Sequence, residues 1–349
     1  MSVFARDFQV PLTEIGAFDA LIDVRSPAEY AEDHIPGAIN LPVLDDDERR
    51  EVGTLYAQNP FAARKLGAAL VAQNLSTMLG QLQDKPKHWR PLVYCWRGGM
   101  RSQSAAVWFG LIGWRAGQLI DGWRAWRRHV LAVLAEAPAR FDWRVICGPT
   151  GSAKTRLLAA LAGQGAQILD LEGLAAHKGS VLGALPGVPQ PTQKWFESRL
   201  TQALGTLDPG QPVFVEAESR KIGQLFMPEA LVATLREAPC LEICATRQAR
   251  IAYLLADYAY LGDDPERLCA ALARLKELVG NETLARWQGW ARAGDLPSLY
   301  AELIERHYDP RYARSQGAHF AKLPDARKLP TDDLSEKGIE DLARLVLEN

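Results

Sequence analysis

Short apolar runs alternate with longer amphipathic stretches between residues 20 and 135. The runs at residues 21–24, 92–95 and 118–120 have the length of strands, whereas residues 102–112 and 122–134 have the length and spacing of helices. This alternation is typical of a parallel sheet with helices packed on its faces. The pattern therefore predicts that the N-terminal part of the chain is an α/β domain.

A second alternating block begins near residue 145. Its predicted elements are a strand at 145–147, a helix at 154–161 and further strands at 168–171, 213–216 and 241–244. From about Pro265 onward the pattern is mainly helical, and residues 135–142, which contain Pro138, look like a linker. We therefore predict a second α/β domain with a helical C-terminal part, and domains over residues 1–137 and 138–349.

Composition fits a folded enzyme better than a disordered or membrane protein. The chain has 349 residues, of which 48% are hydrophobic, enough for two cores. Its N-terminus lacks a basic flank followed by an apolar segment, and no stretch reaches roughly 18 uninterrupted apolar residues. A cytoplasmic protein is the expectation, and the net charge of −2 argues against a polycation built mainly to bind nucleic acid.

The cysteines are scattered and odd in number. There are five of them, with no CxxC pair and no cysteine–histidine spacing suited to zinc: Cys95, Cys147, Cys240, Cys244 and Cys269. We expect free thiols, no structural metal and no tightly bound cofactor.

One cysteine stands where a strand is predicted to end. Cys95 is followed by the loop TrpArgGlyGlyMetArgSer and then by a helix, so its sulfur is expected to lie at a helix N-terminus among backbone N–H groups. Arg97 and Arg101 add positive charge, which favours a nucleophilic thiolate. Gly98 and Gly99 allow the loop to curl, and Ser102 completes the predicted anion cradle. The alternative is a buried, inert cysteine that closes a strand.

This loop resembles that of the rhodanese family. Residues 23–30, AspValArgSerProAlaGluTyr, and 34–42, HisIleProGlyAlaIleAsnLeuPro, are similar to two further rhodanese signatures. In rhodaneses the loop cysteine carries sulfur as a persulfide, so the resemblance implies chalcogen transfer. The Cys-x5-Arg spacing from Cys95 to Arg101 is one residue longer than in the usual sulfurtransferase loop. It resembles the loops of cysteine phosphatases and arsenate reductases, and it would equally fit selenophosphate.

Residues 148–155, GlyProThrGlySerAlaLysThr, lie between a predicted strand and a predicted helix, which is the setting of a P-loop. Its predicted phosphate-binding residues are Gly148, Gly151, Ser152, Lys154 and Thr155, with Lys154 reaching the distal phosphate and Thr155 able to hold Mg²⁺. Ala153 replaces the second glycine of the motif. Glu216 or Glu218, at the end of another predicted strand, is a candidate acid or Mg²⁺ contact. The alternative is a purely structural glycine-rich turn.

A rhodanese domain followed by a P-loop domain resembles the tRNA 2-selenouridine synthases over nearly the whole chain. Further strings support the resemblance: residues 51–56, 177–183, 190–197, 218–223 and 308–310. Membership implies replacement of sulfur by selenium in wobble 2-thiouridine of tRNA, with selenophosphate as selenium donor. It also implies S-geranylation with geranyl diphosphate as the preceding step.

The two predicted sites then divide the work. We expect the P-loop to bind the diphosphate and the Cys95 loop to serve the selenium step. For tRNA, the basic stretch around Arg124, Arg127 and Arg128 is the candidate, with Trp123 and Trp126 either offering faces to bases or packing inside the protein. Five other residues are weaker candidates for the diphosphate or the tRNA: His177, Lys178, Lys194, Arg220 and Lys221.

Two other functions remain open at this point. The Cys-x5-Arg spacing allows a phosphatase or an arsenate reductase fused to a P-loop regulatory domain, with Asp121 as an available general acid. A binding module with an idle rhodanese domain and a nucleotide-controlled P-loop is the third possibility.

Overall fold

The computed structural model describes residues 9–348, apart from the side chains of residues 315–318. Contacts divide the chain into two compact units. The first consists of Met1–Val133 with Glu197–Arg199, and the second of Leu134–Phe196 with Leu200–Asn349. The division falls a few residues before the boundary predicted after residue 137. Among the described residues, no helix is both long and apolar enough to cross a membrane.

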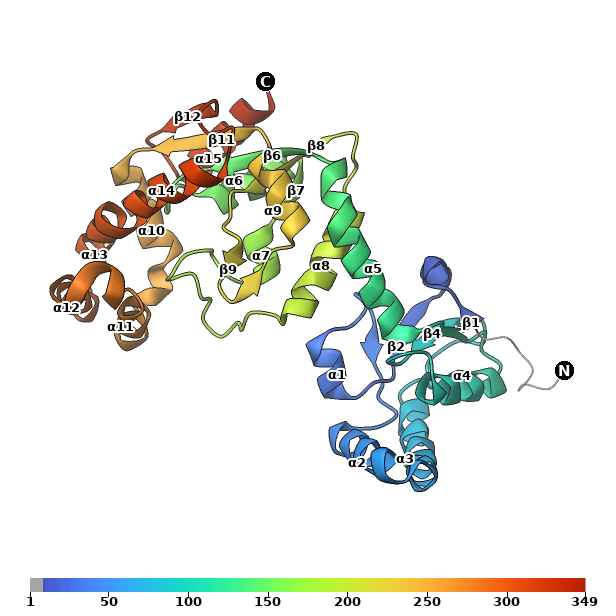
Figure 1. Ribbon diagram of the computed structural model, residues 1–349. Helices are drawn as coiled ribbons and strands as arrows, with labels where there is room; N and C mark the ends of the chain where they lie inside the picture. The colour runs from blue at the N-terminus through green and yellow to red at the C-terminus, as the bar shows by residue number, and fades with distance from the viewer. Residues whose placement is uncertain (1–8, 349) are drawn as a thin grey trace. The chain divides into compact units, whose positions relative to one another are not determined.

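The first unit contains a five-stranded, wholly parallel sheet in the order β1-β5-β4-β2-β3 (Figure 1). Its strands are β1 (Gln9–Val10), β2 (Ala20–Asp23), β3 (Ile39–Asn40), β4 (Pro91–Tyr94) and β5 (Gly117–Leu119). Its helices are the 3-10 turn η2 (Leu12–Ala17), α1 (Pro27–Glu32), α2 (Asp46–Gln58), α3 (Pro60–Gly80), α4 (Met100–Ile112) and α5 (Gly122–Glu136). The three predicted strands and two predicted helices of this unit are confirmed, each within two residues at its ends.

Burial explains why the central strands form where they do. All four residues of β4 are buried, and Val93 joins Ile22 of β2 and Phe109 of α4 in one apolar core. Parallel strands covered on both faces need such near-continuous apolar runs. β4 therefore ends at the centre of the sheet, and its C-terminal end delivers Cys95 directly to the start of α4.

The second unit also has a five-stranded parallel sheet, in the order β12-β11-β6-β8-β7. The strands are β6 (Asp142–Cys147), β7 (Gln167–Leu169), β8 (Pro212–Glu216), β11 (Cys240–Ala245) and β12 (Arg327–Thr331), with a small hairpin of β9 (Lys221–Ile222) and β10 (Leu225–Phe226). Helices α6 (Lys154–Gly163) and α15 (Glu336–Leu347) contribute Leu157, Leu161, Leu342 and Val346 to the core on one face of this sheet. The remaining helices before residue 246 are α7 (Leu171–Ala175), α8 (Gln193–Gly205) and α9 (Glu229–Arg236).

After β11 the chain is mainly helical, as predicted. The elements are α10 (Arg247–Asp257), η4 (Ala259–Leu261), α11 (Pro265–Ala273), α12 (Lys276–Ala293), α13 (Leu296–Leu303), the π-helical turn η5 (Ile304–Tyr308) and α14 (Asp309–His319). They share a separate apolar core around Leu272, Trp287 and Leu303. Figure 1 shows α11, α12 and α13 beside one another, apart from the strands.

Residues 135–142, interpreted as a linker, form regular secondary structure. Helix α5 continues to Glu136, a 3-10 helix η3 (Ala137–Arg140) follows at once, and β6 begins at Asp142. Pro138 lies at the N-terminal end of η3, where its missing N–H leaves no intrahelical hydrogen bond unmade. Ala137 and Pro138 are buried, so this segment packs as part of the fold.

Candidate functional sites

The Cys95 sulfur lies under the first turn of α4. The backbone N–H of Gly99 donates to Sγ at 3.3 Å, and the Ser102 hydroxyl lies 3.1 Å from it. The amide Nε2 of Gln118, on β5, donates to the carbonyls of Gly98 and Gly99 and to Ser102 Oγ. The sulfur thus has one backbone N–H and one hydroxyl within hydrogen-bonding distance.

Two glycines permit the close approach of this loop to β5 and α5. Gly98 has a φ of +65° and Gly122 a φ of +51°. A Cβ atom on Gly122 would lie 2.1 Å from the Cys95 carbonyl oxygen. That carbonyl accepts a hydrogen bond from the Trp123 N–H at 2.8 Å, which ties the start of α5 to the end of β4.

No contact joins either arginine of the predicted cradle to the sulfur among the described residues. Arg101 Nη1 donates to Glu29 Oε2 of α1 at 2.6 Å, and Arg97 is exposed. The described structure therefore brings Gly99 and Ser102 to the sulfur and pairs Arg101 with a carboxylate. Asp121, the candidate acid of the phosphatase interpretation, forms an exposed ion pair with Arg128.

Beneath the loop, the first rhodanese-like signature forms a buried ion pair. Arg25 is 1% exposed and donates to Asp23 and to the Asp33 carbonyl. Its guanidinium also lies over the Trp123 ring, 5.3 Å from the centroid. Arg25 thus supports the cysteine loop from the interior of the sheet. Sequence reasoning assigned roles to neither Arg25 nor Gln118, although Arg25 stands within the quoted signature.

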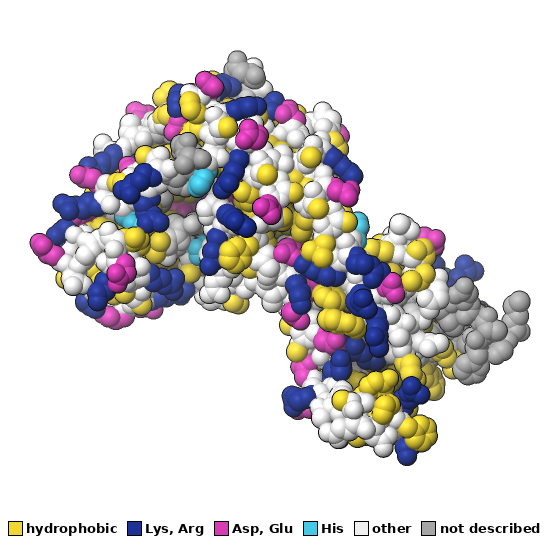
Figure 2. Space-filling model, viewed as in Figure 1, with side chains coloured by type: hydrophobic (Ala, Val, Ile, Leu, Met, Phe, Trp, Pro, Cys, Tyr) yellow, Lys and Arg dark blue, Asp and Glu magenta, His cyan; other side chains and the backbone are white. Residues whose placement is uncertain are grey.

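The basic stretch on α5 is only partly available. Figure 2 shows Lys and Arg side chains gathered on the first unit over the region of α5. Arg124 is exposed, Arg128 pairs with Asp121, and Arg127 pairs with Glu197. Trp123 and Trp126 are 5% and 9% exposed, so they pack inside and offer no free faces to bases. The role of the arginines in tRNA binding stays a prediction.

The phosphate loop connects β6 to α6 as the motif requires. Lys154 Nζ donates to the Gly148 carbonyl at 3.0 Å, across the loop. Gly148 and Gly151 have positive φ angles, and so does Ala153, at +59°. Ala153 therefore keeps the left-handed conformation that favours glycine, and the loop retains its shape at some cost in strain.

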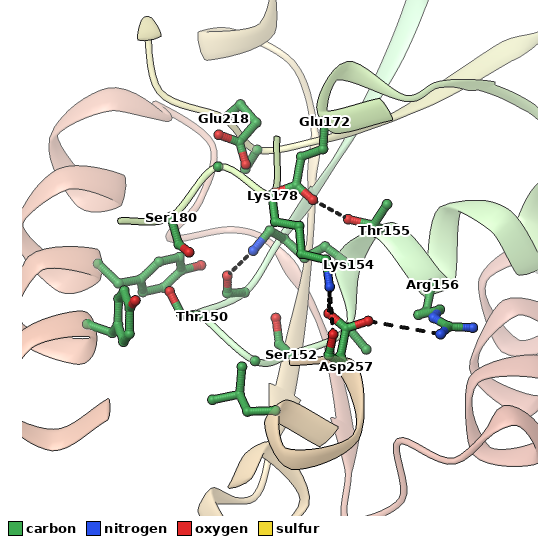
Figure 3. Close-up of a pocket in the computed structure, with 18 of the residues that line it drawn as sticks. Thr150, Ser152, Lys154, Thr155, Arg156, Glu172, Lys178, Ser180, Glu218 and Asp257 are labelled. Carbon is green, nitrogen blue, oxygen red and sulfur yellow. Dashed lines mark hydrogen bonds and ion pairs between the residues drawn. The ribbon is translucent and has the colours of Figure 1, made fainter. Parts of the chain in front are cut away.

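A pair of carboxylates lies beside Thr155. The Thr155 hydroxyl donates to Glu172 Oε2 at 2.7 Å, and both the Glu172 and Glu218 carboxylates lie within 2.8 Å of the position that a Cβ on Gly179 would take (Figure 3). Burial and the neighbouring Glu172 raise the pKa of Glu218 to about 8. Of the two acids predicted on β8, it is Glu218 that lines the cavity. Glu216 is fully buried and accepts a hydrogen bond from the Glu172 N–H.

Glu172 was missed because it directly follows the predicted strand at 168–171 and lies within a helix, α7, that is too short for its pattern to show. The carboxyl end of β7 was the available signal, since ligands of parallel sheets gather at that edge. Among the described residues, no group of three or more His, Cys, Asp or Glu side chains could hold a metal.

The phosphate loop opens into a cavity of about 790 Å³. Figure 2 shows a hollow in the second unit with Lys and Arg side chains on its rim. The cavity is also lined by apolar and aromatic side chains, Tyr253, Leu254, Tyr258, Tyr308 and Tyr312, and Leu254 packs against Gly151 of the loop. One cavity therefore combines the phosphate loop with apolar and aromatic surface.

Of the weaker candidates, Lys178 lines this cavity. Its Nζ binds Asp257 Oδ2 at 2.6 Å and lies 4.3 Å from the Tyr258 ring centroid. His177 is buried, which lowers its pKa. Arg220 and Lys221 are exposed and do not line the cavity. The prediction for Lys194 stays untested.

Two family models match the chain. Residues 9–129 match the rhodanese-like domain, and residues 141–323 match the AAA domain of tRNA 2-selenouridine synthase. A tRNA 2-selenouridine synthase of Aeromonas salmonicida (strain A449) is 34% identical over 85% of this chain and 87% of its own length. The proteins of the same name from Nitrosomonas europaea and Cupriavidus necator are 36% and 32% identical, over 77% and 87% of this chain and 71% and 90% of their own lengths. With both domains matched in this order and relatives aligned along most of its length, the chain belongs to the tRNA 2-selenouridine synthase family.

Proposed function

We propose that this protein replaces the sulfur of wobble 2-thiouridine in tRNA by selenium from selenophosphate, by way of an S-geranyl intermediate made from geranyl diphosphate. The observation that carries the proposal is the cavity of the second unit. A phosphate loop and apolar, aromatic side chains that line the same cavity suit a ligand with a diphosphate head and a hydrocarbon tail.

In the first step, the thione sulfur attacks C1 of the geranyl group. The C1–O bond breaks, and its electron pair leaves with pyrophosphate. Departure of this anion needs positive charge and N–H donors at the leaving oxygens, which Lys154 and the loop amides supply.

In the second step, the selenium of selenophosphate attacks C2 of the base, the C2–S bond breaks and the S-geranyl group leaves as geranylthiol. Water then cleaves the P–Se bond, which releases phosphate and leaves selenium on C2. Geranylation converts the sulfur into a better leaving group, which is the reason for the order of the steps. We assign this step to Cys95 with Gly99 and Ser102, because an N–H group, a hydroxyl and a thiol of one loop lie together there.

Mg²⁺ would be held by Thr155, Glu172 and Glu218, a set of oxygen ligands of the kind that Mg²⁺ prefers. The cation would neutralise charge on the pyrophosphate. Because Glu218 is largely protonated near neutral pH, binding of Mg²⁺ with pyrophosphate should release a proton from it. Calorimetry in buffers of different ionisation enthalpy measures that release, and equal proton release by the wild type and Glu218→Gln would contradict this ligand set.

The test is nucleoside mass spectrometry of 2-thiouridine-containing tRNA incubated with the purified protein, geranyl diphosphate and selenophosphate, each omitted in turn. A geranylated nucleoside without selenophosphate, converted to a selenonucleoside when it is added, is the expected result. An unchanged nucleoside in every mixture would refute the proposal.

Two variants separate the sites. Lys154→Ala should impair geranylation, with exposed Lys337→Ala as its matched control. Cys95→Ser should geranylate but fail to incorporate selenium, with the exposed Cys244→Ser as control. Normal geranylation by Lys154→Ala, or normal selenium incorporation by Cys95→Ser, would remove the corresponding assignment.

A further inference from the structure

Two arginines of α14 face the phosphate-loop cavity without a carboxylate partner. Arg311 and Arg314, one helical turn apart, both line the cavity and are exposed. Within the part of the chain that the structure describes, neither guanidinium forms an ion pair. Two other exposed arginines of this helical region are paired, Arg247 with Glu305 and Arg306 with Glu302.

The other cations of the cavity are largely committed to protein groups. Lys178 pairs with Asp257 at 2.6 Å, and Arg156 lies 4.0 Å from the same carboxylate (Figure 3). Burial and the nearby Arg311 guanidinium lower the pKa of His307 to about 4, so this side chain is neutral near pH 7. Among the described residues that line the cavity, Lys154, Arg311 and Arg314 carry positive charge without a carboxylate within 4.0 Å.

Helix α14 is also fixed to the phosphate loop. Arg250, on α10, is 5% exposed and donates to the Thr150 carbonyl from Nη2 at 2.7 Å and from Nε at 3.0 Å. The same guanidinium forms a bidentate pair with Asp309, the first residue of α14, at 2.6 and 3.0 Å. One buried side chain thus sets the position of α14 relative to the loop.

We propose that Arg311 and Arg314 bind the distal phosphate of the diphosphate held by the phosphate loop, and that Arg250 positions them through Asp309. The inference rests on the proposed function and adds two binding residues to it. Pyrophosphate carries about three negative charges near neutral pH and becomes fully charged as it leaves, so one lysine is an incomplete counterion. The two guanidinium groups supply the charge that the loop lacks, and their fork of N–H donors suits phosphate oxygens.

The experiment measures binding of inorganic pyrophosphate to the full-length protein, with Mg²⁺, by calorimetry. Arg311→Ala with Arg314→Ala should weaken binding about tenfold or more. It should also flatten the dependence of affinity on salt, since two fewer charges meet the anion. Arg306→Ala, an exposed arginine of the same region paired with Glu302, is the matched control and should bind like the wild type.

Asp309→Ala tests the positioning role, because the two possible effects have opposite signs. Removing a negative charge near the cavity would by itself strengthen pyrophosphate binding. Loss of the link to Arg250 should instead weaken it. Tighter binding by Asp309→Ala would refute the role given to Arg250.

The outcomes separate this inference from the function on which it rests. If the wild type and the double arginine variant bind pyrophosphate equally, the arginine assignment is wrong and the phosphate-loop assignment stands. If the double variant loses affinity for tRNA and keeps its affinity for pyrophosphate, the arginines serve the tRNA and the inference is overturned. If the wild type binds neither pyrophosphate nor geranyl diphosphate, both proposals fail.

Discussion

Ala153 offers a direct test of strain in the phosphate loop. It occupies the left-handed region at φ +59° and ψ +31°, where an L-residue with a Cβ costs about 1–2 kcal/mol. Ala153→Gly relieves that cost. The change also removes a methyl group that is 5% exposed, worth about 0.8 kcal/mol. It further gives the unfolded chain more freedom, worth about 0.4–1 kcal/mol.

These contributions nearly cancel, so Ala153→Gly should change the free energy of unfolding by no more than about 1 kcal/mol in either direction. Ala160→Gly is the matched control, because it makes the same chemical change inside α6 at helical backbone angles. There no strain is relieved, and the loss should be about 1 kcal/mol or more. Ala153→Val should destabilise most of the three, since a β-branched side chain suits a positive φ least.

Urea unfolding of the wild type and the three variants, followed by tryptophan fluorescence, measures these differences. The decisive quantity is the gap between Ala153→Gly and Ala160→Gly, expected at about 1 kcal/mol in favour of the former. Equal destabilisation by both changes would refute the argument that Ala153 is strained.

Three further predictions concern the two loops. Gly122→Ala should destabilise the first unit by more than about 2 kcal/mol, measured by thermal unfolding, because its Cβ would lie 2.1 Å from the Cys95 carbonyl oxygen; unchanged stability would contradict that contact. Gln118→Ala should speed alkylation of Cys95 by iodoacetamide, followed by mass spectrometry, because Gln118 bonds two carbonyls of the loop and Ser102; an unaltered rate would mean that Gln118 does not hold the loop. Because the pKa of Glu218 is raised from 4.5 to about 8, the folded protein binds its proton more tightly, so the stability of the wild type relative to Glu218→Gln should fall as the pH rises through that window, by an amount on the order of a few kcal/mol. Urea unfolding of both proteins across the window measures this slope, and parallel curves would exclude the raised pKa.

Strands and helices that carry a site were the most predictable from the sequence. β4 and the last three residues of β6 are buried apolar runs. Each strand is followed by a loop whose glycines indicate a turn into a helix. Strong local patterns of this kind fix an element even when its ends shift by a residue. The missed elements lack them. β1 and β3 have two residues each, and β12 is a mostly polar edge strand whose pairing with β11 depends on distant parts of the chain.

The positions of the candidate site residues were predictable where a contiguous motif contains them, and not where only the fold brings them together. Cys95 and Lys154 could be predicted because each belongs to a contiguous motif. The partners of Arg101 and Thr155 could not, since Glu29 and Glu172 reach them from other elements of the fold. Arg250 is a further case, because only the folded chain brings its guanidinium to Thr150 and Asp309.

The burial of Cys95 limits thiol–disulfide exchange at its sulfur. Its side chain is 3% exposed, and Gly99 and Ser102 cover the sulfur. A thiolate in the open would exchange with glutathione disulfide and with other proteins. With so little of the side chain exposed, a bulky disulfide cannot approach the sulfur unless the loop opens, so the enclosure slows adventitious exchange at Cys95.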